Sequence, residues 1–158
     1  MPKQAKPRGP EDLEALMPEN QLCFALYSAS LAMSKAYKPL LEPLNLTYLQ
    51  YLVMLALWSG GTSNLSQIAK RLALDSPTLT PVLKRLEAAG YVQRTRDPAD
   101  DRKIVLALTD AGVQLKAQVK TIQAGIASAS SCTLEEAQDL TGKLRELRAQ
   151  LALDQEAA

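Results

Sequence analysis

The stretch from residue 74 to residue 90 constrains the fold of this chain more than any other segment, because it carries start and stop signals for a helix. It reads Leu-Asp-Ser-Pro-Thr-Leu-Thr-Pro-Val-Leu-Lys-Arg-Leu-Glu-Ala-Ala-Gly. Asp75 or Ser76 can accept hydrogen bonds from the free N–H groups of the first turn, and the proline that follows suits the first helical position. Gly90 can take the left-handed conformation that ends a helix. We therefore expect a helix over residues 77–89.

The two faces of this expected helix differ in chemistry. Its apolar stripe has helical spacing (Leu79, Val82, Leu83 and Leu86), whereas its other positions carry short hydroxyl groups followed by cations (Ser76, Thr78, Thr80, Lys84 and Arg85). The hydroxyls of Ser76 and Thr78 suit base edges in a DNA groove, and the two cations suit phosphates. Pro81 is expected to be tolerated because it falls in the first turns. A short capped helix of any globular protein is the alternative.

The segment before this helix predicts two further helices. Thr47 is expected to cap a helix that is apolar nearly all round, and therefore buried, and that ends at the glycine pair after residue 59. Residues 62–63 predict a very short strand. Asn64, with a glutamine three residues later, resembles a capping box that opens a helix over residues 65–72. Two short helices joined by a tight turn are the helix-turn-helix arrangement.

The segment after the helix predicts a β-hairpin. Residues 91–96 and 103–108 alternate in polarity, and residues 97–102 have turn composition, which places Arg102 and Lys103 at the tip. A hairpin that follows a helix-turn-helix makes a winged helix, and an arginine at the wing tip can enter a narrow minor groove. The candidate DNA contacts in the wing are Arg94, Arg96, Asp100, Arg102 and Lys103.

Composition narrows the class of protein. Of the 158 residues, 47% are apolar and 4% aromatic, which suits a folded, Leu- and Ala-rich helical chain. The net charge is +1, so nucleic-acid binding must come from local clusters of cations. No apolar run approaches the roughly 18 residues that span a bilayer, and the Pro-rich start lacks the apolar core of a signal peptide. We therefore expect a cytoplasmic protein without a membrane partner.

The residues that most often carry chemistry are scarce. The chain has no histidine, which removes the commonest general base and metal ligand. Cys23 and Cys132 lie far apart and form no Cys-x-x-Cys unit, which argues against a zinc site and against a thioredoxin-like site. We expect no metal, no cofactor and no catalytic residue. Inert apolar packing is the alternative reading of both thiols.

A long helix is expected on each side of the winged helix. Residues 20–37 keep a helical period, after which Pro39 and Pro43 are expected to break or kink the chain. Thr109 or Asp110 is expected to cap a helix over residues 111–127. A Ser/Ala stretch follows, and then Thr133 opens a last amphipathic helix with Leu134, Leu140, Leu144, Leu147 and Leu151 on one side.

These terminal helices carry more apolar surface than one small core can cover, so we expect a homodimer that is formed by both termini. The expected fold is mainly α, with a small β-hairpin wing. We divide the chain into a flexible tail over residues 1–18, a helical dimerisation region over residues 19–45 and 109–153, and a winged helix-turn-helix DNA-binding domain over residues 46–108.

A longer motif covers residues 72–108. It reads Leu-x-Asp-Ser-x-Thr-Leu-Thr-Pro-x-Leu-Lys-Arg-Leu-Glu-x-x-Gly-Tyr-Val-x-Arg, followed by Asp-Asp-Arg and a closing Leu-Ala-Leu-Thr. This motif resembles the MarR family of dimeric winged-helix regulators. Residues 20–27, 37–41 and 46–52 are similar to the organic-hydroperoxide-sensing branch of that family, OhrR.

The resemblance implies a repressor whose reduced dimer binds a palindromic operator in double-stranded DNA and whose sensing thiol is Cys23. It implies that two tyrosines of the partner subunit, here at Tyr37 and Tyr48, hydrogen-bond this thiol, and that an organic hydroperoxide oxidises it to a sulfenic acid. Cys132 occupies the place of the second cysteine in the two-cysteine type, which implies an intersubunit disulfide with Cys23. In the family the wing aspartate, here Asp100, orients the wing arginine.

The residues near Cys23 are consistent with this role. A reactive thiol must be substantially thiolate, and the first turns of a helix favour an anion. Tyrosine hydroxyls can donate to it. Tyr27 lies one turn farther on the same face, where it either lines the pocket or packs. The neighbours Leu22, Phe24, Leu26 and Met33 suit an alkyl hydroperoxide, and no Lys or Arg lies within a helical turn.

Two other functions stay open. A regulator of the same fold can respond to a small phenolic or other apolar ligand, with both cysteines structural. A thiol peroxidase is the alternative of another class. It is disfavoured because no basic residue lies near Cys23, and because it leaves the cations of the winged helix unexplained. Asp100 and Arg102 can also form an ordinary surface pair.

Overall fold

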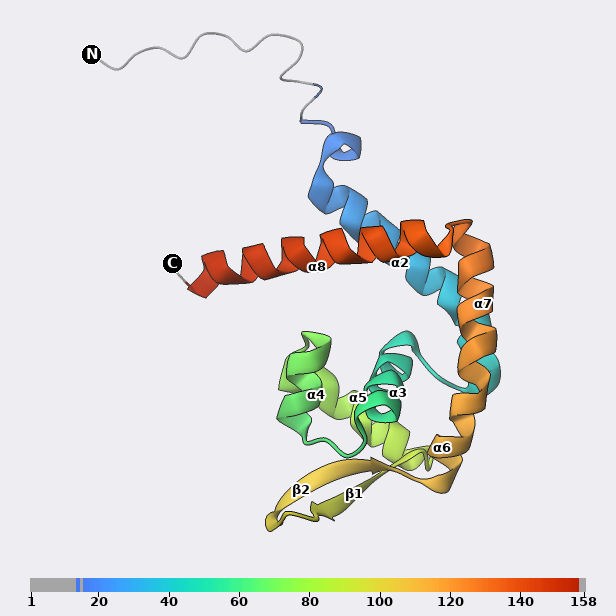
Figure 1. Cartoon of the computed structure of the whole chain (residues 1–158), viewed down its shortest axis with the longest axis vertical. Helices are drawn as coiled ribbons and strands as arrows, with labels where there is room; N and C mark the ends of the chain where they lie inside the picture. Colours follow the sequence, from blue (N-terminus) through green and yellow to red (C-terminus); the bar gives the residue numbers. More distant parts are fainter. Residues whose placement is uncertain (1–13, 15, 157–158) are drawn as a thin grey trace, which may run out of the picture.

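The structure, a computed structural model, describes residue 14 and residues 16–156, with side chains as far as residue 152. Helices dominate these residues, and a two-stranded sheet lies at one end (Figure 1). In chain order the elements are η1 (Pro18–Asn20), α2 (Leu22–Leu41), η2 (Glu42–Leu44), α3 (Tyr48–Gly60), α4 (Leu65–Leu72), α5 (Ser76–Ala88), β1 (Val92–Asp97), β2 (Asp100–Leu108), α6 (Asp110–Leu115), η3 (Lys116–Gln118), α7 (Val119–Ser130) and α8 (Leu134–Glu156). Most of the expected tail over residues 1–18 lies outside the described residues.

Two capping boxes set where the helix-turn-helix begins. At α3 the Gln50 N–H donates to Thr47 Oγ1 at 3.3 Å, and the Thr47 N–H donates to Gln50 Oε1 at 2.7 Å. Asn64 and Gln67 form the same reciprocal pair at α4. Both predictions are confirmed because a cap needs only one side chain and the N–H group three residues later.

The core of the winged helix lies between α3, α4, α5 and the sheet. α3 is the buried helix that its apolar sequence predicts, with Tyr51, Val53, Met54, Ala56 and Leu57 inside. The apolar stripe of α5 packs against it, and Leu79, Leu83 and Leu86 are each at most 1% exposed. The fourth stripe residue, Val82, is half-buried. Leu41 from the end of α2 and Ile122 from α7 belong to the same core, so the winged helix and the roots of these two helices pack together.

The wing differs from its prediction in where the second strand begins. β1 and β2 are antiparallel, and β2 begins at Asp100, three residues earlier than expected. The turn consists of residues 98–99 only. The register shifts between Arg96 and Asp97, so residues 101–103 form a bulge on β2. The turn-like composition of this segment thus covers two features, a short turn and a bulge.

The very short strand expected at residues 62–63 is a single bridging residue. The Ser63 N–H donates to the Leu106 carbonyl at 3.1 Å, and the Leu106 N–H donates back at 2.8 Å. Gly61, with φ of 71°, ends α3 just before it. The bridge therefore ties the connection between α3 and α4 to the wing.

α2 continues two residues past Pro39, to Leu41, and the chain then turns within residues 40–44, where the two prolines are expected to break or kink it. Pro39 removes one N–H from the helical ladder, but tertiary packing holds the turns around it. Leu41 is 1% exposed, and Leu40 packs so closely on α7 that a Cβ added at Gly125 would lie 2.7 Å from it. The chain changes direction only after α2, where Pro43 lies in η2.

The C-terminal helices also depart from the prediction. Thr109 caps α6, since its Oγ1 accepts the Gly112 N–H at 3.1 Å. The expected single helix over residues 111–127 tightens at η3, and the Ser/Ala stretch continues α7 to Ser130 because alanine favours the helix. Thr133 caps α8 as expected, with its Oγ1 accepting the N–H of the third helical residue at 3.2 Å.

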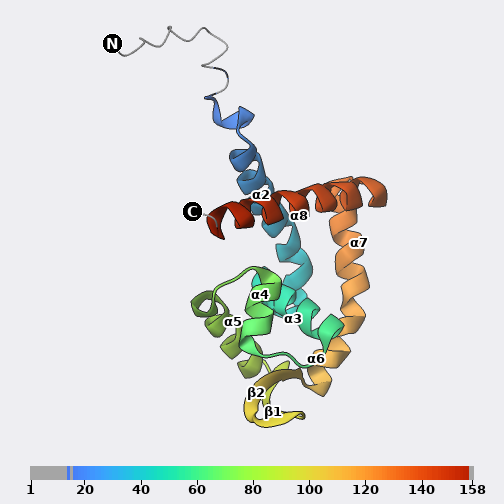
Figure 2. The ribbon, with the colours of Figure 1, turned by 60° about the vertical axis from the view of Figure 1, so that its left-hand side comes forward.

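The long helices form a frame above the winged helix. α7 rises from α6 beside the end of α2, and α8 turns back and crosses α2, as both views show (Figures 1 and 2). Within the described residues, no helix taken singly has the length and apolar character to cross a membrane. α2 with η2 and α3 meets that criterion only as a pair bent by 72°.

Candidate functional site

The first turn of α5 presents the hydroxyl groups assigned to DNA. α5 begins at Ser76, one residue early, and Asp75 caps it by accepting the Thr78 N–H at 2.7 Å. Hydrogen bonds from the side chain and backbone of Thr78 hold the pKa of Asp75 below its usual value. The Thr80 hydroxyl donates to the Ser76 carbonyl at 2.7 Å, so only its oxygen stays available, as an acceptor. Ser76 and Thr78 are exposed, whereas Thr80 is half-buried.

The exposed face of α5 also carries prolines. Ser76, Pro77, Thr78, Pro81, Lys84, Arg85 and Ala88 are all exposed. Pro81 is the sixth residue of α5, beyond the N–H groups that lack a helical acceptor, so it removes the bond to the Pro77 carbonyl. The expectation that Pro81 falls where a missing N–H costs little is therefore wrong. α5 keeps its course because Leu79, Leu83 and Leu86 anchor its other face in the core.

The wing presents one highly exposed arginine. Arg102 and Lys103 lie in the bulge beside the hairpin tip, not at the tip. Asp100 Oδ1 accepts Arg102 Nε at 3.1 Å, and Lys103 Nζ lies 3.5 Å from Asp100 Oδ2. Hydrogen bonds from Arg102, and less so from Lys103, hold the pKa of Asp100 below its usual value. The Arg102 side chain is nevertheless 90% exposed, so it extends from the wing with one end tethered.

The two arginines of β1 contact the protein itself. Arg94 Nε lies 2.7 Å from Oε1 of Glu87, in the last turn of α5. Arg96 Nη1 donates to the Asp101 carbonyl at 2.5 Å and so braces the bulge. Sequence reasoning missed Glu87 and Asp101, because strand alternation predicts which face a residue occupies but not its partner on another element.

The structure separates Cys23 from Tyr37. Cys23, in the first turn of α2, and Cys132, between α7 and α8, are both free and exposed. Cys132 Sγ lies 3.5 Å from the Ser130 carbonyl oxygen. Tyr37 follows Cys23 by 14 residues on one continuous helix, which is about 21 Å at 1.5 Å per residue. Tyr27 is near Cys23 on α2 and 63% exposed. In the described residues no group of three acidic, Cys or His side chains could hold a metal.

Tyr37 and Tyr48 do lie together. Their ring centroids are 4.7 Å apart, and Tyr51 lies 5.7 Å from Tyr37. Burial raises the pKa of Tyr37 to about 12, with smaller contributions from its two neighbours, and burial raises the pKa of Tyr48 and Tyr51 as well. These hydroxyls therefore stay protonated at neutral pH and can donate a hydrogen bond.

Sequence reasoning missed how far this aromatic cluster extends. The Trp58 ring lies 6.4 Å from Tyr51, edge to face, and its Nε1–H donates to the Gly112 carbonyl at 2.8 Å. Gly112 leaves no room for a side chain, since an added Cβ would lie 2.1 Å from the Tyr91 carbonyl oxygen. The spacing of Tyr48, Tyr51 and Trp58, three and then seven residues, could have indicated one helical face. The cluster joins α2 to the root of α6.

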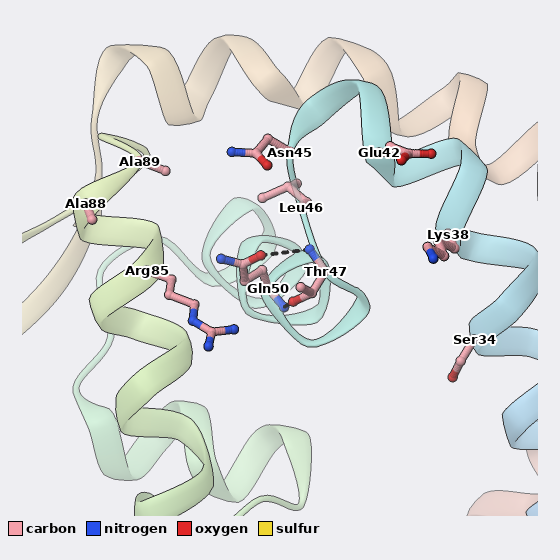
Figure 3. A pocket seen from close by; sticks show the side chains of 10 residues that line it. All are labelled: Ser34, Lys38, Glu42, Asn45, Leu46, Thr47, Gln50, Arg85, Ala88 and Ala89. Atoms are coloured by element: carbon pink, nitrogen blue, oxygen red, sulfur yellow. Dashed lines mark hydrogen bonds between the residues drawn. The ribbon is translucent and has the colours of Figure 1, made fainter.

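A hollow of about 760 Å³ lies between α2, the start of α3 and the end of α5 (Figure 3). It is lined by Ser34, Lys38, Glu42, Asn45, Leu46, Thr47, Gln50, Arg85, Ala88 and Ala89. Figure 3 shows Arg85 extending from α5 toward the start of α3, with Lys38 on the opposite wall. Arg85 thus faces this hollow, although the sequence predicts it only as a phosphate contact.

Proteins of similar sequence have been named as regulators. The family profile described as transcriptional regulator SarA/Rot matches residues 35–119, more than half of the chain, including the whole winged helix. The organic hydroperoxide resistance transcriptional regulator of Bacillus subtilis is 44% identical over 80% of this chain and 86% of its own. The HTH-type transcriptional regulator TtmR of Methylorubrum extorquens is 43% identical over 90% of this chain and 72% of its own.

A solved structure of similar fold is bound to DNA. Reduced AbfR on DNA superposes with a TM-score of 0.70 at 36% identity, over 90% of this chain and 96% of that one. AbfR, from Staphylococcus epidermidis, is also solved with a disulfide formed, at a TM-score of 0.59 and 37% identity over 87% and 96%. The fold, the exposed hydroxyls and cations of the winged helix, and the similarity to these relatives all indicate the same family. The chain therefore belongs to the MarR family of winged-helix transcriptional regulators.

Proposed function

We propose that this chain acts as a homodimeric repressor, which binds a palindromic operator when reduced and releases it when an organic hydroperoxide oxidises Cys23. The name of the Bacillus subtilis relative supports the signal, and the DNA-bound reduced form and the disulfide form of AbfR support redox control. Residues 19–45 and 109–153 form the dimer, and residues 46–108 bind DNA. Cys132 of one subunit closes a disulfide with Cys23 of the other.

The separation of Cys23 from the tyrosine pair is the observation that carries this proposal. Because α2 is continuous, no side-chain movement brings Cys23 to Tyr37 within one chain. The Tyr37 ring contacts the Tyr48 ring in a tilted arrangement, and both hydroxyls keep their protons at neutral pH. A second copy, docked through the exposed apolar side chains of α2, supplies the Cys23 thiolate that these donors stabilise.

The chemistry balances with two thiols and one hydroperoxide. The Cys23 thiolate attacks the distal oxygen of the peroxide, the O–O bond breaks, and the alkoxide takes a proton and leaves as the alcohol. Cys23 is then a sulfenic acid. The Cys132 thiolate attacks its sulfur, an S–S bond forms, and hydroxide leaves as water after taking a proton. The disulfide protects Cys23 from irreversible oxidation.

On the DNA side, the contacts divide by chemistry. Ser76 and Thr78 read base edges, Lys84 and Arg85 meet phosphates, and Arg102, held by Asp100, enters the minor groove. Thr80 offers an acceptor beside them. A two-fold dimer reads half-sites about one helical turn apart, so a small rotation of each winged helix on oxidation breaks the match to both half-sites.

A gel shift tests the proposal, with a duplex that the reduced wild-type protein selects from a randomised library. Cumene hydroperoxide should release wild type, whereas Cys23→Ser should keep its DNA. Cys132→Ser is the matched control: its Cys23 still reacts, but no cross-linked dimer should appear on a non-reducing gel. Release of Cys23→Ser by peroxide would contradict the sensor assignment, and a cross-linked dimer of Cys132→Ser would contradict the disulfide.

A thiol peroxidase is the alternative from another class, and turnover separates it from a sensor. A sensor consumes about one hydroperoxide per Cys23 before reduction, whereas an enzyme consumes many in the presence of dithiothreitol. Dithiothreitol also regenerates the thiols of a sensor, so the rate separates the two, and we expect only slow consumption because no cation lies within a helical turn of Cys23 to assist the leaving alkoxide. Fast, sustained turnover would favour the enzyme.

The hollow beside Arg85 favours a second candidate function, a regulator that responds to a small phenolic or apolar molecule with both cysteines structural. Its volume of about 760 Å³ suits such a molecule, and Lys38 and Arg85 could hold an acidic group on it. The test uses a hydroxybenzoate as probe and the Cys23→Ser/Cys132→Ser variant on the selected duplex. Two results together would support this function: the probe releases the duplex from this variant, and it no longer does so when Lys38→Met is also introduced. If the probe releases no duplex, this function is excluded for that probe.

A further inference from the structure

We propose that Glu87 and Arg94 form a positioning pair that fixes the wing to α5, and that Arg94 acts through Glu87 rather than by binding a phosphate. This inference rests on the DNA-binding role proposed for α5 and the wing. It changes the assignment of one residue that the sequence places among the DNA contacts. It also assigns a role to a carboxylate on the same surface as the DNA contacts.

The pair joins two elements that the chain connects by a short link. Arg94 Nε lies 2.7 Å from Glu87 Oε1, and the side chains are 50% and 25% exposed. Strand alternation puts Arg94 on the same face of β1 as Val92, which is 2% exposed in the core. The Tyr91 N–H donates to the Leu86 carbonyl at 3.1 Å, so the backbone already holds the root of β1 against α5. The ion pair adds a second anchor, three residues after Tyr91.

The other ion pairs of the described residues are local. Arg102 and Lys103 pair with Asp100 inside the wing, and Lys143 pairs with Asp139 inside α8. The Glu87–Arg94 pair is the one that links two different elements. It therefore restrains the angle between α5 and the wing, which the local pairs do not affect.

This angle decides whether α5 and Arg102 reach DNA together. The bulge that carries Arg102 lies on β2, opposite the step from Arg96 to Asp97, and Arg96 is two residues beyond Arg94, or roughly 7 Å along β1. A rotation of β1 at its root moves Arg102 away from the groove that α5 fixes.

Glu87→Gln separates the two roles of Arg94 by the sign of its effect. If Arg94 positions the wing, Glu87→Gln weakens binding of the selected duplex by about two- to fivefold, which is what an exposed ion pair contributes. If Arg94 binds a phosphate, Glu87→Gln removes a competitor and a repelling charge, and binding tightens. Tighter binding would overturn the inference.

The salt dependence of DNA binding by Arg94→Gln is a second measurement, and a simple loss of packing would not change it. A phosphate ligand that is lost reduces the slope of log K against log salt by about one, whereas a positioning residue leaves it unchanged. Arg102→Gln is the matched control on the same wing and should reduce the slope. A reduced slope for Arg94→Gln would overturn the inference.

The charge swap completes the test. Arg94→Glu should bind poorly, and Glu87→Arg/Arg94→Glu should regain most of the lost affinity, because the pair re-forms with its charges exchanged. A double variant that binds no better than Arg94→Glu would overturn the inference. The Asp139→Lys/Lys143→Asp swap on α8 controls for general charge effects. If the wild-type protein selects no duplex at all, the DNA-binding proposal fails first, and that outcome is distinct from a failure of the pair.

Discussion

Between residues 46 and 108 most large apolar side chains are buried, with Ile104 on the wing an exception, whereas many of those on α2 and α8 face solvent. Leu57, Leu79, Leu83 and Leu86 in the winged helix are each at most 1% exposed. On the two long helices the exposed set is Leu22, Phe24, Tyr27, Leu31, Met33, Leu134, Leu140, Leu144 and Leu151, with exposed fractions from 38% to 75%. The same chain thus contains one region with a closed core and one whose apolar face is uncovered.

The difference shows which region can fold by contacts within one chain and which region needs a partner to cover it. The winged helix is specified by contacts within one chain, so the surface offered to DNA is built before any partner arrives. The α2 and α8 faces need a cover of similar chemistry, and a second copy offers one in a two-fold arrangement. The proposed sensing mechanism requires the same arrangement, because Cys23 lies far from Tyr37 along α2 and would reach the tyrosines only of a second copy.

The first prediction concerns the exposed apolar face of α2 and α8. Leu144→Glu on α8 should abolish the homodimer, because it would place a charge in an apolar interface. Leu144 lines a hollow with Leu26 of α2, where the two helices cross. Sedimentation velocity measures the result. Ile104→Glu on the wing is the matched control, since Ile104 is equally large and 58% exposed but lies outside the frame. If Leu144→Glu forms a dimer as tight as that of Ile104→Glu, the exposed apolar face of α2 and α8 is not the dimer interface.

The second prediction compares one leucine from each region in the Leu144→Glu background, where assembly no longer contributes. Leu83→Ala should lower the free energy of unfolding by about 2–5 kcal/mol, because it opens a cavity in a closed core. Leu151→Ala should change it by less than roughly 0.5 kcal/mol, since that side chain is 55% exposed. Urea unfolding measures both. Equal losses would mean that the two regions do not differ.

The starts of helices were predictable from the sequence, because a cap is a local signal. Thr47, Asn64, Thr109 and Thr133 each accept the N–H three residues later, as their sequences indicate. Packing over longer distances was not predictable in the same way. Pro39 is an example: a helix breaker by propensity stays helical because Leu40 and Leu41 are anchored by residues far away in the sequence.

In the candidate site, too, local features were predictable from the sequence and contacts between elements were not. The exposed positions of Ser76, Thr78 and Lys84 on α5 could be predicted from helical periodicity, whereas the hollow that Arg85 faces could not. The wing could not, because its bulge depends on the register between β1 and β2, and a shift of register moves every residue. The pairing of Arg94 with Glu87 and the position of Trp58 beside Gly112 depend on how elements meet, which one sequence does not record.

The third prediction concerns the tyrosines at the boundary between the two regions. The folded pKa of Tyr37 is about 12 and its ordinary value is 10, so the folded state keeps a proton that the unfolded state loses. The stabilisation is therefore complete below pH 10 and is lost as pH rises toward 12. We expect a fall of about 1–2 kcal/mol in the free energy of unfolding over this range. Tyr37→Phe should fall less in the same urea titration. Identical curves would contradict the burial of this hydroxyl.

The last prediction concerns the hydrogen bond that joins the winged helix to the helices beyond it. Trp58 in the core of the winged helix donates to the Gly112 carbonyl at the root of α6, at 2.8 Å. Trp58→Phe keeps most of the ring contact with Tyr51 but removes this donor, and should lower the free energy of unfolding by about 1 kcal/mol. If the two regions communicate through this bond, the reduced variant keeps its affinity for the selected duplex while peroxide releases it less completely. Tyr91→Phe is the matched control, because its hydroxyl reaches the Leu44 carbonyl only at 3.4 Å and contributes little. A Trp58→Phe protein with normal release would contradict communication through this bond.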